Sequence, residues 1–177
     1  LGGLIKYDGS SFTTYNMNDG LRSDDIWSVA IDRDGVIWVG TLKGVDTFDG
    51  KTFTPFAIPD SEPDATRGVT SASIVHSIMQ DSQGKMWFGT NGGAYIYDGT
   101  TLTNLSEKDG LANNSVNSIH EDRKGNFWFA THHNGISQYD GDRFTNYTER
   151  GDIDGIEVWS IFEDSSGNIW FPAEGYS

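Results

Sequence analysis

Residues 81–90 read Asp-Ser-Gln-Gly-Lys-Met-Trp-Phe-Gly-Thr, and this stretch decides the fold because the chain repeats it. An aspartate, a glycine three positions later and a tryptophan three positions after the glycine recur at residues 32–41, 122–131 and 164–173. The four tryptophans are Trp38, Trp87, Trp128 and Trp170, with spacings of 49, 41 and 42 residues, and because they are periodic we expect all four to be packing residues. A period of this size is typical of radially repeated, four-stranded β-sheets.

Each repeat divides into four predicted strands. The first is an apolar run around a serine, as in residues 27–31, and it ends at the Asp-x-x-Gly turn. That turn predicts a hairpin, because glycine tolerates positive φ and the aspartate can bond backbone amides. The second strand contains the tryptophan among aromatic and β-branched residues, which favour strands. The third ends at an aromatic-Asp-Gly mark such as residues 97–99, and the fourth alternates polar and apolar residues, as in 51–56.

These marks together resemble the two-component regulator propeller repeat, and residues 108–141 match its pattern almost throughout. The resemblance covers essentially the whole chain. It implies an all-β fold, a β-propeller of about seven four-stranded antiparallel blades. It also implies a role in the extracytoplasmic sensing half of a bacterial two-component-type regulator, in the periplasm or outside the cell. The resemblance is more specific for fold than for function, because one fold serves many functions.

We interpret residues 1–177 as a single β-propeller segment, with repeat marks at 1–41, 42–90, 91–131 and 132–173. The chain starts with the two outer strands of one blade and stops after the two inner strands of another. Three arrangements fit: a closed four-bladed ring, half of a larger ring completed by a second copy, or a fragment of a longer chain. We favour the last two, within a toroid of about seven or eight blades, because blades of this family suit a shallow angle.

An open arc has consequences for partners. It exposes unpaired strand edges and apolar blade faces at both ends. We therefore expect self-association or contact with the remaining blades of a longer chain.

Composition excludes several function classes. The net charge of −14, from 26 acidic and 12 basic residues, argues against binding of nucleic acid or an anionic membrane surface. The chain has no cysteine and no apolar run of membrane-spanning length, so we expect neither thiol chemistry nor membrane insertion of this segment. No cofactor or metal is predicted, because one carboxylate in each Asp-x-x-Gly turn lacks the convergent oxygens that calcium requires.

One connection is longer than the others. Residues 57–73 account for the 49-residue interval, and their Pro, Ser and acidic residues predict an exposed insertion loop. The loop lies on the face where outer strands lead into inner ones. It is either an insertion without function or a lip over a binding funnel, in which case Arg67 is its most useful ligand-facing group.

Two sets of positions converge on that same face and vary between repeats while their neighbours stay the same. One set begins the innermost strand of each blade, and the other follows the repeated tryptophan by four or five positions. From them we predict a ligand-binding funnel. Its members are Trp27, Lys43, His76, Asn91, Asn117, His132, His133 and Trp159, together with Arg67. Aromatic faces and polar groups of this kind suit a glycan or another polar small molecule; the alternative is a solvent-exposed rim without a ligand.

An enzyme is a further alternative. The Gly-Asn-x-Trp-Phe motif of the repeats is also similar to that of streptogramin-type lyases, which are propellers that use His and Glu with a divalent metal. On this reading His76, His132, His133 and Glu174 supply the base and the metal ligands. Adjacent histidines on a strand point to opposite faces, however, so at most one enters a site unless the backbone turns there. We therefore predict no catalytic residues, and a purely structural interaction scaffold is the remaining alternative.

Overall fold

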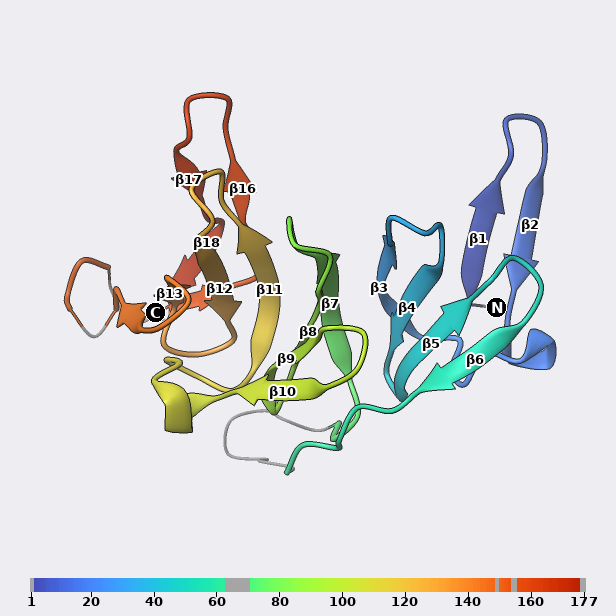
Figure 1. The fold of residues 1–177 in the computed structure, drawn as a ribbon, viewed down its shortest axis with the longest axis horizontal. Helices are drawn as coiled ribbons and strands as arrows, with labels where there is room; N and C mark the ends of the chain where they lie inside the picture. The colour runs from blue at the N-terminus through green and yellow to red at the C-terminus, as the bar shows by residue number, and fades with distance from the viewer. Residues whose placement is uncertain (1, 63–70, 149, 154–155, 176–177) are drawn as a thin grey trace.

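The computed structural model describes residues 2–62, 71–148, 150–153 and 156–175, and in them the chain forms a row of antiparallel β-sheets (Figure 1). Within these residues, three complete four-stranded sheets lie between two incomplete ones. The all-β propeller prediction is therefore confirmed.

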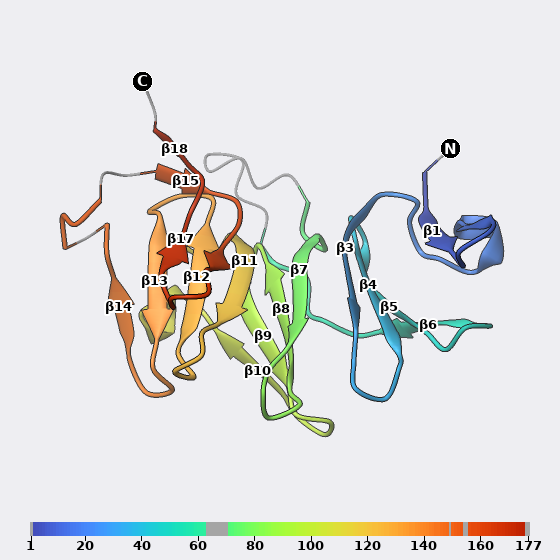
Figure 2. The same ribbon diagram turned by 90° about the horizontal axis from the view of Figure 1, so that it is seen from above.

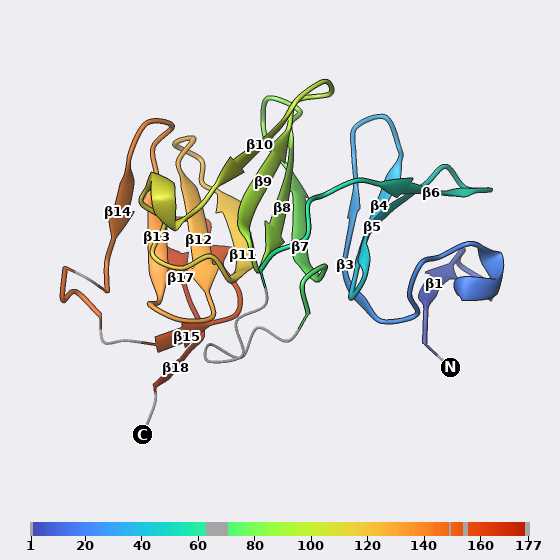
Figure 3. The same cartoon turned by 90° about the horizontal axis from the view of Figure 1, so that it is seen from below.

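The three complete sheets are called here the first, second and third blades. Their strands are β3 (Ile26–Ile31), β4 (Ile37–Thr41), β5 (Gly44–Phe48) and β6 (Phe53–Phe56); β7 (Val75–Gln80), β8 (Met86–Thr90), β9 (Gly93–Tyr97) and β10 (Leu102–Leu105); and β11 (Val116–Glu121), β12 (Phe127–Thr131), β13 (Ile136–Tyr139) and β14 (Phe144–Asn146). In each blade the strands pair in sequence order. The first strands β3, β7 and β11 pack beside one another along the row, as Figures 2 and 3 show from opposite sides.

Two half-blades flank this row. An N-terminal half-blade pairs β1 (Leu4–Tyr7) with β2 (Phe12–Tyr15). A C-terminal half-blade pairs β15 (Ile156–Val158) with β18 (Ala173–Gly175), and β16 (Phe162–Glu163) with β17 (Ile169–Trp170). The N-terminal pair corresponds to the two outer strands of a blade, and the C-terminal pairs correspond to the two inner strands.

The repeated aspartate and tryptophan form one hydrogen-bonded unit in each hairpin. In the second blade, Asp81 Oδ1 accepts from the backbone amides of Gln83 and Lys85 at 2.9 and 2.8 Å. Asp81 Oδ2 accepts from Trp87 Nε1 at 2.8 Å. Gly84 completes the turn with a φ of 91°, which a residue with a side chain rarely adopts. The same bond joins Asp32 to Trp38, Asp122 to Trp128 and Asp164 to Trp170.

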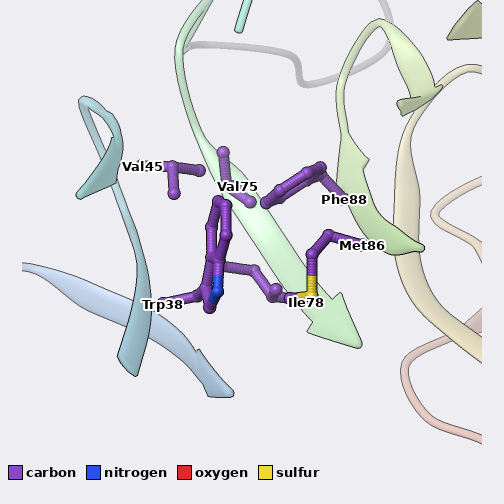
Figure 4. Packing of buried hydrophobic residues seen from close by; sticks show 6 residues of the cluster. All are labelled: Trp38, Val45, Val75, Ile78, Met86 and Phe88. Carbon is purple, nitrogen blue, oxygen red and sulfur yellow. The ribbon is translucent and has the colours of Figure 1, made fainter. Parts of the chain in front are cut away.

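The core lies between blades rather than within one sheet. Figure 4 shows Trp38 and Val45 of the first blade packed against Val75, Ile78 and Phe88 of the second. Phe88 is completely buried, and its ring centroid lies 5.6 Å from that of Trp38. Each repeated tryptophan therefore depends on the next blade for its burial.

Two of the connections between blades contain an Asp-Gly-Leu sequence, at residues 19–21 and 109–111. Two short 3-10 helices, η1 (Met17–Asp19) and η3 (Glu107–Asp109), precede the glycine. Capping boxes begin both helices, with Asn16 and Ser106 as the N-caps. The leucines that follow, Leu21 and Leu111, are buried and anchor the connection to the core.

The ends of the row differ from its interior, and one prediction is wrong there. Trp170 was expected to pack like the other repeated tryptophans, but it is 61% exposed, whereas Trp87 is 3% exposed. The physical reason is that the structure holds no blade beyond the C-terminal half-blade to cover it. At the opposite end Val29 is 48% exposed, while the corresponding Ile78 of the second blade is buried.

Candidate functional site

A β-bulge occurs at the same place in each complete blade, and the bulged residue is a predicted site residue. The pairing of β3 with β4 shifts between Ile26 and Ser28. The corresponding shifts skip His76 in the second blade and Asn117 in the third. A bulged residue is left out of the ladder and its side chain is re-aimed. Trp27, His76 and Asn117 are therefore placed by one repeated backbone irregularity.

These residues meet at a cavity of about 200 Å³ on the face where one blade leads into the next. Every complete blade and the C-terminal half-blade contribute to its wall. The lining residues are Trp27, Leu42, Ser71, Ile74, His76, Asn91, Ser115, Asn117, His132 and Trp159. The cavity thus brings together six of the nine predicted ligand-binding residues.

Two tryptophan–histidine pairs stand in the cavity wall. The Trp27 and His76 rings meet edge to face with centroids 5.6 Å apart, and the Trp159 and His132 rings meet in the same way at 5.6 Å. Both tryptophans keep about half of their surface exposed, at 51% for Trp27 and 44% for Trp159. Exposed indole faces held in place by a neighbouring ring are suited to stacking against the apolar face of a ligand.

Asn91 joins three segments of the cavity wall. Its Nδ2 donates to the carbonyl oxygen of Ser71 at 3.0 Å, and its Oδ1 accepts from Ser115 Oγ at 2.8 Å. The same Oδ1 lies 3.0 Å from His76 Nε2. Because Ser71 belongs to the insertion 57–73, the base of that loop is bonded directly into the cavity.

The insertion is held at its described base by further bonds. Ser61 donates to the carbonyl oxygen of Ala72 from both its amide, at 2.8 Å, and its hydroxyl, at 2.7 Å. Ser71 Oγ donates to the carbonyl oxygen of Leu42 at 3.1 Å. The predicted loop therefore borders the funnel at its base, while Arg67 lies outside the described residues.

His132 contacts an acidic residue beside the cavity. Its Nδ1 pairs with the carboxylate of Glu157, whose side chain is only 13% exposed. His132 and His133 do not alternate as on a strand, because the chain bends after β12, as the sequence analysis allowed, and their ring centroids lie 4.5 Å apart. Asn134, with a φ of 64°, marks that bend.

Burial sets the protonation state of His76. Desolvation lowers the pKa of the imidazole below its usual 6.5, and the nearby His132 lowers it further, while the bond with Asn91 acts in the opposite direction. His76 is therefore neutral at pH 7. On the opposite wall, Asn117 Nδ2 donates to the carbonyl oxygen of Val158 at 2.8 Å, and its buried Oδ1 has no hydrogen-bond partner.

The remaining predicted residues lie elsewhere. Lys43 and His133 are not among the lining residues of the cavity. Glu174, assigned to the lyase alternative, is exposed in β18, and Glu157 takes the place beside His132 instead. The sequence analysis missed Glu157 because it placed the cavity-facing position of this repeat two residues later, at Trp159. Ser71 was missed because nothing in the loop sequence indicates which residue bonds Asn91.

Two features are absent from the described residues. Within them, no group of three or more His, Cys, Asp or Glu side chains gathers as a metal site. Nor does any described helix have the length and apolar character needed to cross a membrane.

Comparison with known families supports the interpretation of the repeats. The family model for the two component regulator propeller matches residues 20–43, 68–92 and 110–133, so the predicted resemblance is confirmed. Each of the three matched segments includes the first two strands of one complete blade and the turn that follows them. No curated protein matches the chain in sequence.

Solved structures place the fold among bacterial propellers. The extracellular domain of a hybrid two component system from B. thetaiotaomicron, BT3049, aligns with 25% identity and a TM-score of 0.77 over 96% of this chain. PorZ of Porphyromonas gingivalis, a surface component of the type-IX secretion system, aligns with 14% identity and a TM-score of 0.67 over 98%. A catalytically inactive virginiamycin B lyase from Staphylococcus aureus aligns with 14% identity and a TM-score of 0.57 over 83%.

The chain is short beside these proteins. It spans 24% of BT3049, 29% of PorZ and 48% of the lyase.

Proposed function

We propose that this chain is a non-catalytic ligand-binding segment of a β-propeller, which belongs to the extracytoplasmic sensing part of a bacterial two-component-type regulator. Its ligand is a carbohydrate or another polar small molecule held in the cavity between the blades. Support for the sensing role comes from the repeats and from the likeness to the extracellular domain of BT3049. Support for the ligand comes from the cavity itself.

The observation that carries this proposal is the pair of half-exposed tryptophans in the cavity wall. Neither Trp27 nor Trp159 belongs to the repeated Asp–Trp unit, so the blade does not need an indole at either position. Apolar rings that remain half exposed beside hydrogen-bonding side chains are typical of sites that stack the C–H face of a sugar. Asn91, His76 and Asn117 supply the polar groups between them.

The position of the cavity suggests how binding is reported. Its wall is built by residues of four successive sheets, so a bound ligand bridges several blades. A ligand that prefers one relative position of the blades shifts the population toward it. The same shift can act on contacts with further blades or with a second copy of the chain.

The experiment is a glycan array followed by tryptophan fluorescence titration of the best ligand. We expect Trp27→Ala and Trp159→Ala each to weaken binding by about tenfold to a hundredfold, as the loss of an anchoring aromatic residue does. Trp170→Ala is the matched control, because Trp170 is also exposed but lies in the hairpin of the C-terminal half-blade. If neither substitution in the cavity affects binding, or if no glycan or peptide binds, the chain is an interaction scaffold.

A second candidate function is the lyase reaction, favoured by the His132–Glu157 pair in the cavity. A paired histidine can act as a general base, and such chemistry would also need a Lewis acid on the departing oxygen. We expect no turnover of quinupristin with or without a divalent metal ion. Metal-dependent turnover that disappears in His132→Ala would overturn the non-catalytic assignment.

A further inference from the structure

A chain of hydrogen bonds that starts at the insertion loop determines which atoms of the cavity wall donate and which accept. The carbonyl oxygen of Ser71 can only accept, so Asn91 must turn its Nδ2 toward it, and the 3.0 Å separation agrees. The Oδ1 of Asn91 then faces the interior, where Ser115 Oγ donates to it at 2.8 Å. The carbonyl oxygen of Ser71 thus fixes the orientation of this amide, and the hydroxyl of Ser115, which can donate or accept, is compatible with it.

Asn91 in turn fixes the tautomer of His76. An amide oxygen carries no proton, so the 3.0 Å contact between Asn91 Oδ1 and His76 Nε2 requires the proton to lie on Nε2. In a neutral imidazole the other nitrogen is then an acceptor. Within the described residues, no hydrogen-bond donor to His76 Nδ1 is found, so this lone pair is left for a ligand or water.

The opposite wall of the cavity also presents a hydrogen-bond acceptor. Asn117 uses its Nδ2 to donate to the carbonyl oxygen of Val158 at 2.8 Å. Its Oδ1 is buried without a partner, and the whole residue is only 6% exposed. A buried amide oxygen without a partner is unfavourable, and a ligand or water hydroxyl would satisfy it. The positive charge that His132 can carry is already opposed by Glu157.

We propose that Asn91 is a positioning residue that holds His76 as a hydrogen-bond acceptor, so that the cavity selects an uncharged ligand that donates hydrogen bonds through hydroxyl groups. The selection rests on the proposed function of the cavity, whereas the positioning of His76 does not. An anionic ligand would meet two acceptors, His76 Nδ1 and Asn117 Oδ1, and the described residues that line the cavity include no Lys or Arg to offset its charge. We therefore expect the described part of the site to favour neutral sugars over uronic acids.

The positioning role is tested without any ligand, by long-range ¹H–¹⁵N NMR of the imidazoles in the full chain at pH 7.5. His76→Gln assigns the signal. We expect a neutral His76 ring with the proton on Nε2, and in Asn91→Leu a shift of the proton toward Nδ1 or a mixture of the two tautomers. The control is Asn104→Leu, because Asn104 belongs to the same blade but donates to the carbonyl oxygen of Gly92 instead; there the tautomer should not change.

Two results overturn the positioning role: a proton on Nδ1 in the wild-type protein, or an unchanged tautomer in folded Asn91→Leu. Circular dichroism establishes that the variant is folded. If Asn91→Leu does not fold, Asn91→Asp serves instead, since a carboxylate at the same place must raise the pKa of His76 in the NMR titration. An unchanged titration in that variant contradicts the proposal.

The selectivity is tested with neutral hexose oligosaccharides and matching hexuronate oligosaccharides on one array. We expect the neutral member of each pair to bind at least about tenfold more tightly, which corresponds to about 1.4 kcal/mol. Preference for the uronates overturns the selectivity even if the tautomer is as expected. Binding of neither series contradicts the proposed carbohydrate ligand, while the NMR result still decides the role of Asn91.

Discussion

At the scale of single residues, the repeated aspartate does more than cap a turn. Its Oδ1 orders the hairpin backbone and its Oδ2 holds the indole N–H of the tryptophan six positions later. The pair of residues that gives the sequence its period is therefore one physical unit. Where the next blade covers the tryptophan, this bond lies in the core.

The first prediction tests that unit in two settings. Asp81→Ala leaves the indole N–H of Trp87 without its partner in a site that is 3% exposed. We expect the free energy of unfolding to fall by about 2–4 kcal/mol, since a bond to a charged group is lost and a buried donor is left unpaired. Urea denaturation measures the change. Asp164→Ala is the matched control and should have a much smaller effect, because Trp170 is exposed to water.

The second prediction concerns pH and His76. Its pKa is lowered in the folded protein, chiefly by burial, so the unfolded chain binds a proton more readily. Above about pH 6.5 His76 is neutral in both states and does not lower the free energy of unfolding. As the pH falls from 6.5 toward the lower folded pKa, protonation of the unfolded chain reduces the free energy of unfolding. The titratable groups that face it are His132 and, through it, Glu157.

The measurement is the free energy of unfolding at several pH values between 7.5 and 5. We expect the wild-type protein to lose more stability over this interval than His76→Gln, which has no group to protonate there. Equal losses in the two proteins would show that other groups set the acid sensitivity.

At the scale of elements, adjacent blades approach so closely that their second strands tolerate only small residues at one place. A methyl group on Gly89 in β8 would lie 2.8 Å from the carbonyl oxygen of Val116 and 2.4 Å from Ser77 Oγ. Gly40 of the first blade has the same surroundings in Ser28 and Val75. The serine of the first strand and the glycine of the second are therefore complementary features of one contact.

The third prediction follows from that contact. Gly89→Ala should destabilise the protein by about 1–3 kcal/mol, because the backbone of β11 cannot move away without disturbing the third blade. Chemical denaturation provides the measurement. The control is Ala130→Gly in the third blade, where an alanine already occupies the corresponding position. Loss of its methyl group should change the free energy of unfolding by no more than about 1 kcal/mol. A similar effect of both substitutions would contradict the close-approach argument.

The sequence predicts strands and hairpins well because their determinants are local. Asp81, Gly84 and Trp87 lie within one hairpin, and four copies reduce ambiguity. It also predicts six of the positions that line the cavity, because a repeat reveals where residues are free to vary. It does not predict which side chains bond across blades: the bond of Asn91 to Ser71 and the pairing of His132 with Glu157 depend on the relative placement of separate segments.

At the scale of the whole molecule, the row of sheets presents two apolar end faces. Phe162 and Trp170 are 63% and 61% exposed at one end, and Val29 and Ile31 are 48% and 66% exposed at the other. Corresponding residues inside the row, such as Ile78, are buried. Exposed apolar surface of this kind marks a place where another blade or another molecule packs.

The fourth prediction is that the isolated 177-residue chain self-associates through these faces. The double variant Phe162→Lys and Trp170→Lys should sediment with a smaller average mass than the wild type at the same concentration, because the charges cannot be buried without partners. Met17→Lys is the control, since Met17 is 52% exposed but lies in the outer connection η1. A sedimentation coefficient of the wild-type protein that does not change with concentration would contradict the prediction.

The bulge at the start of each innermost strand has a consequence for how such a protein can diversify. Residues 27 and 76 occupy bulges, outside the ladder that holds each sheet together. In the proposed binding role, stability and recognition thus depend on different residues of the same repeat. A gene encoding this chain can accumulate changes at these codons, or a combinatorial library can randomise them, with new binding specificities drawn from an unaltered framework.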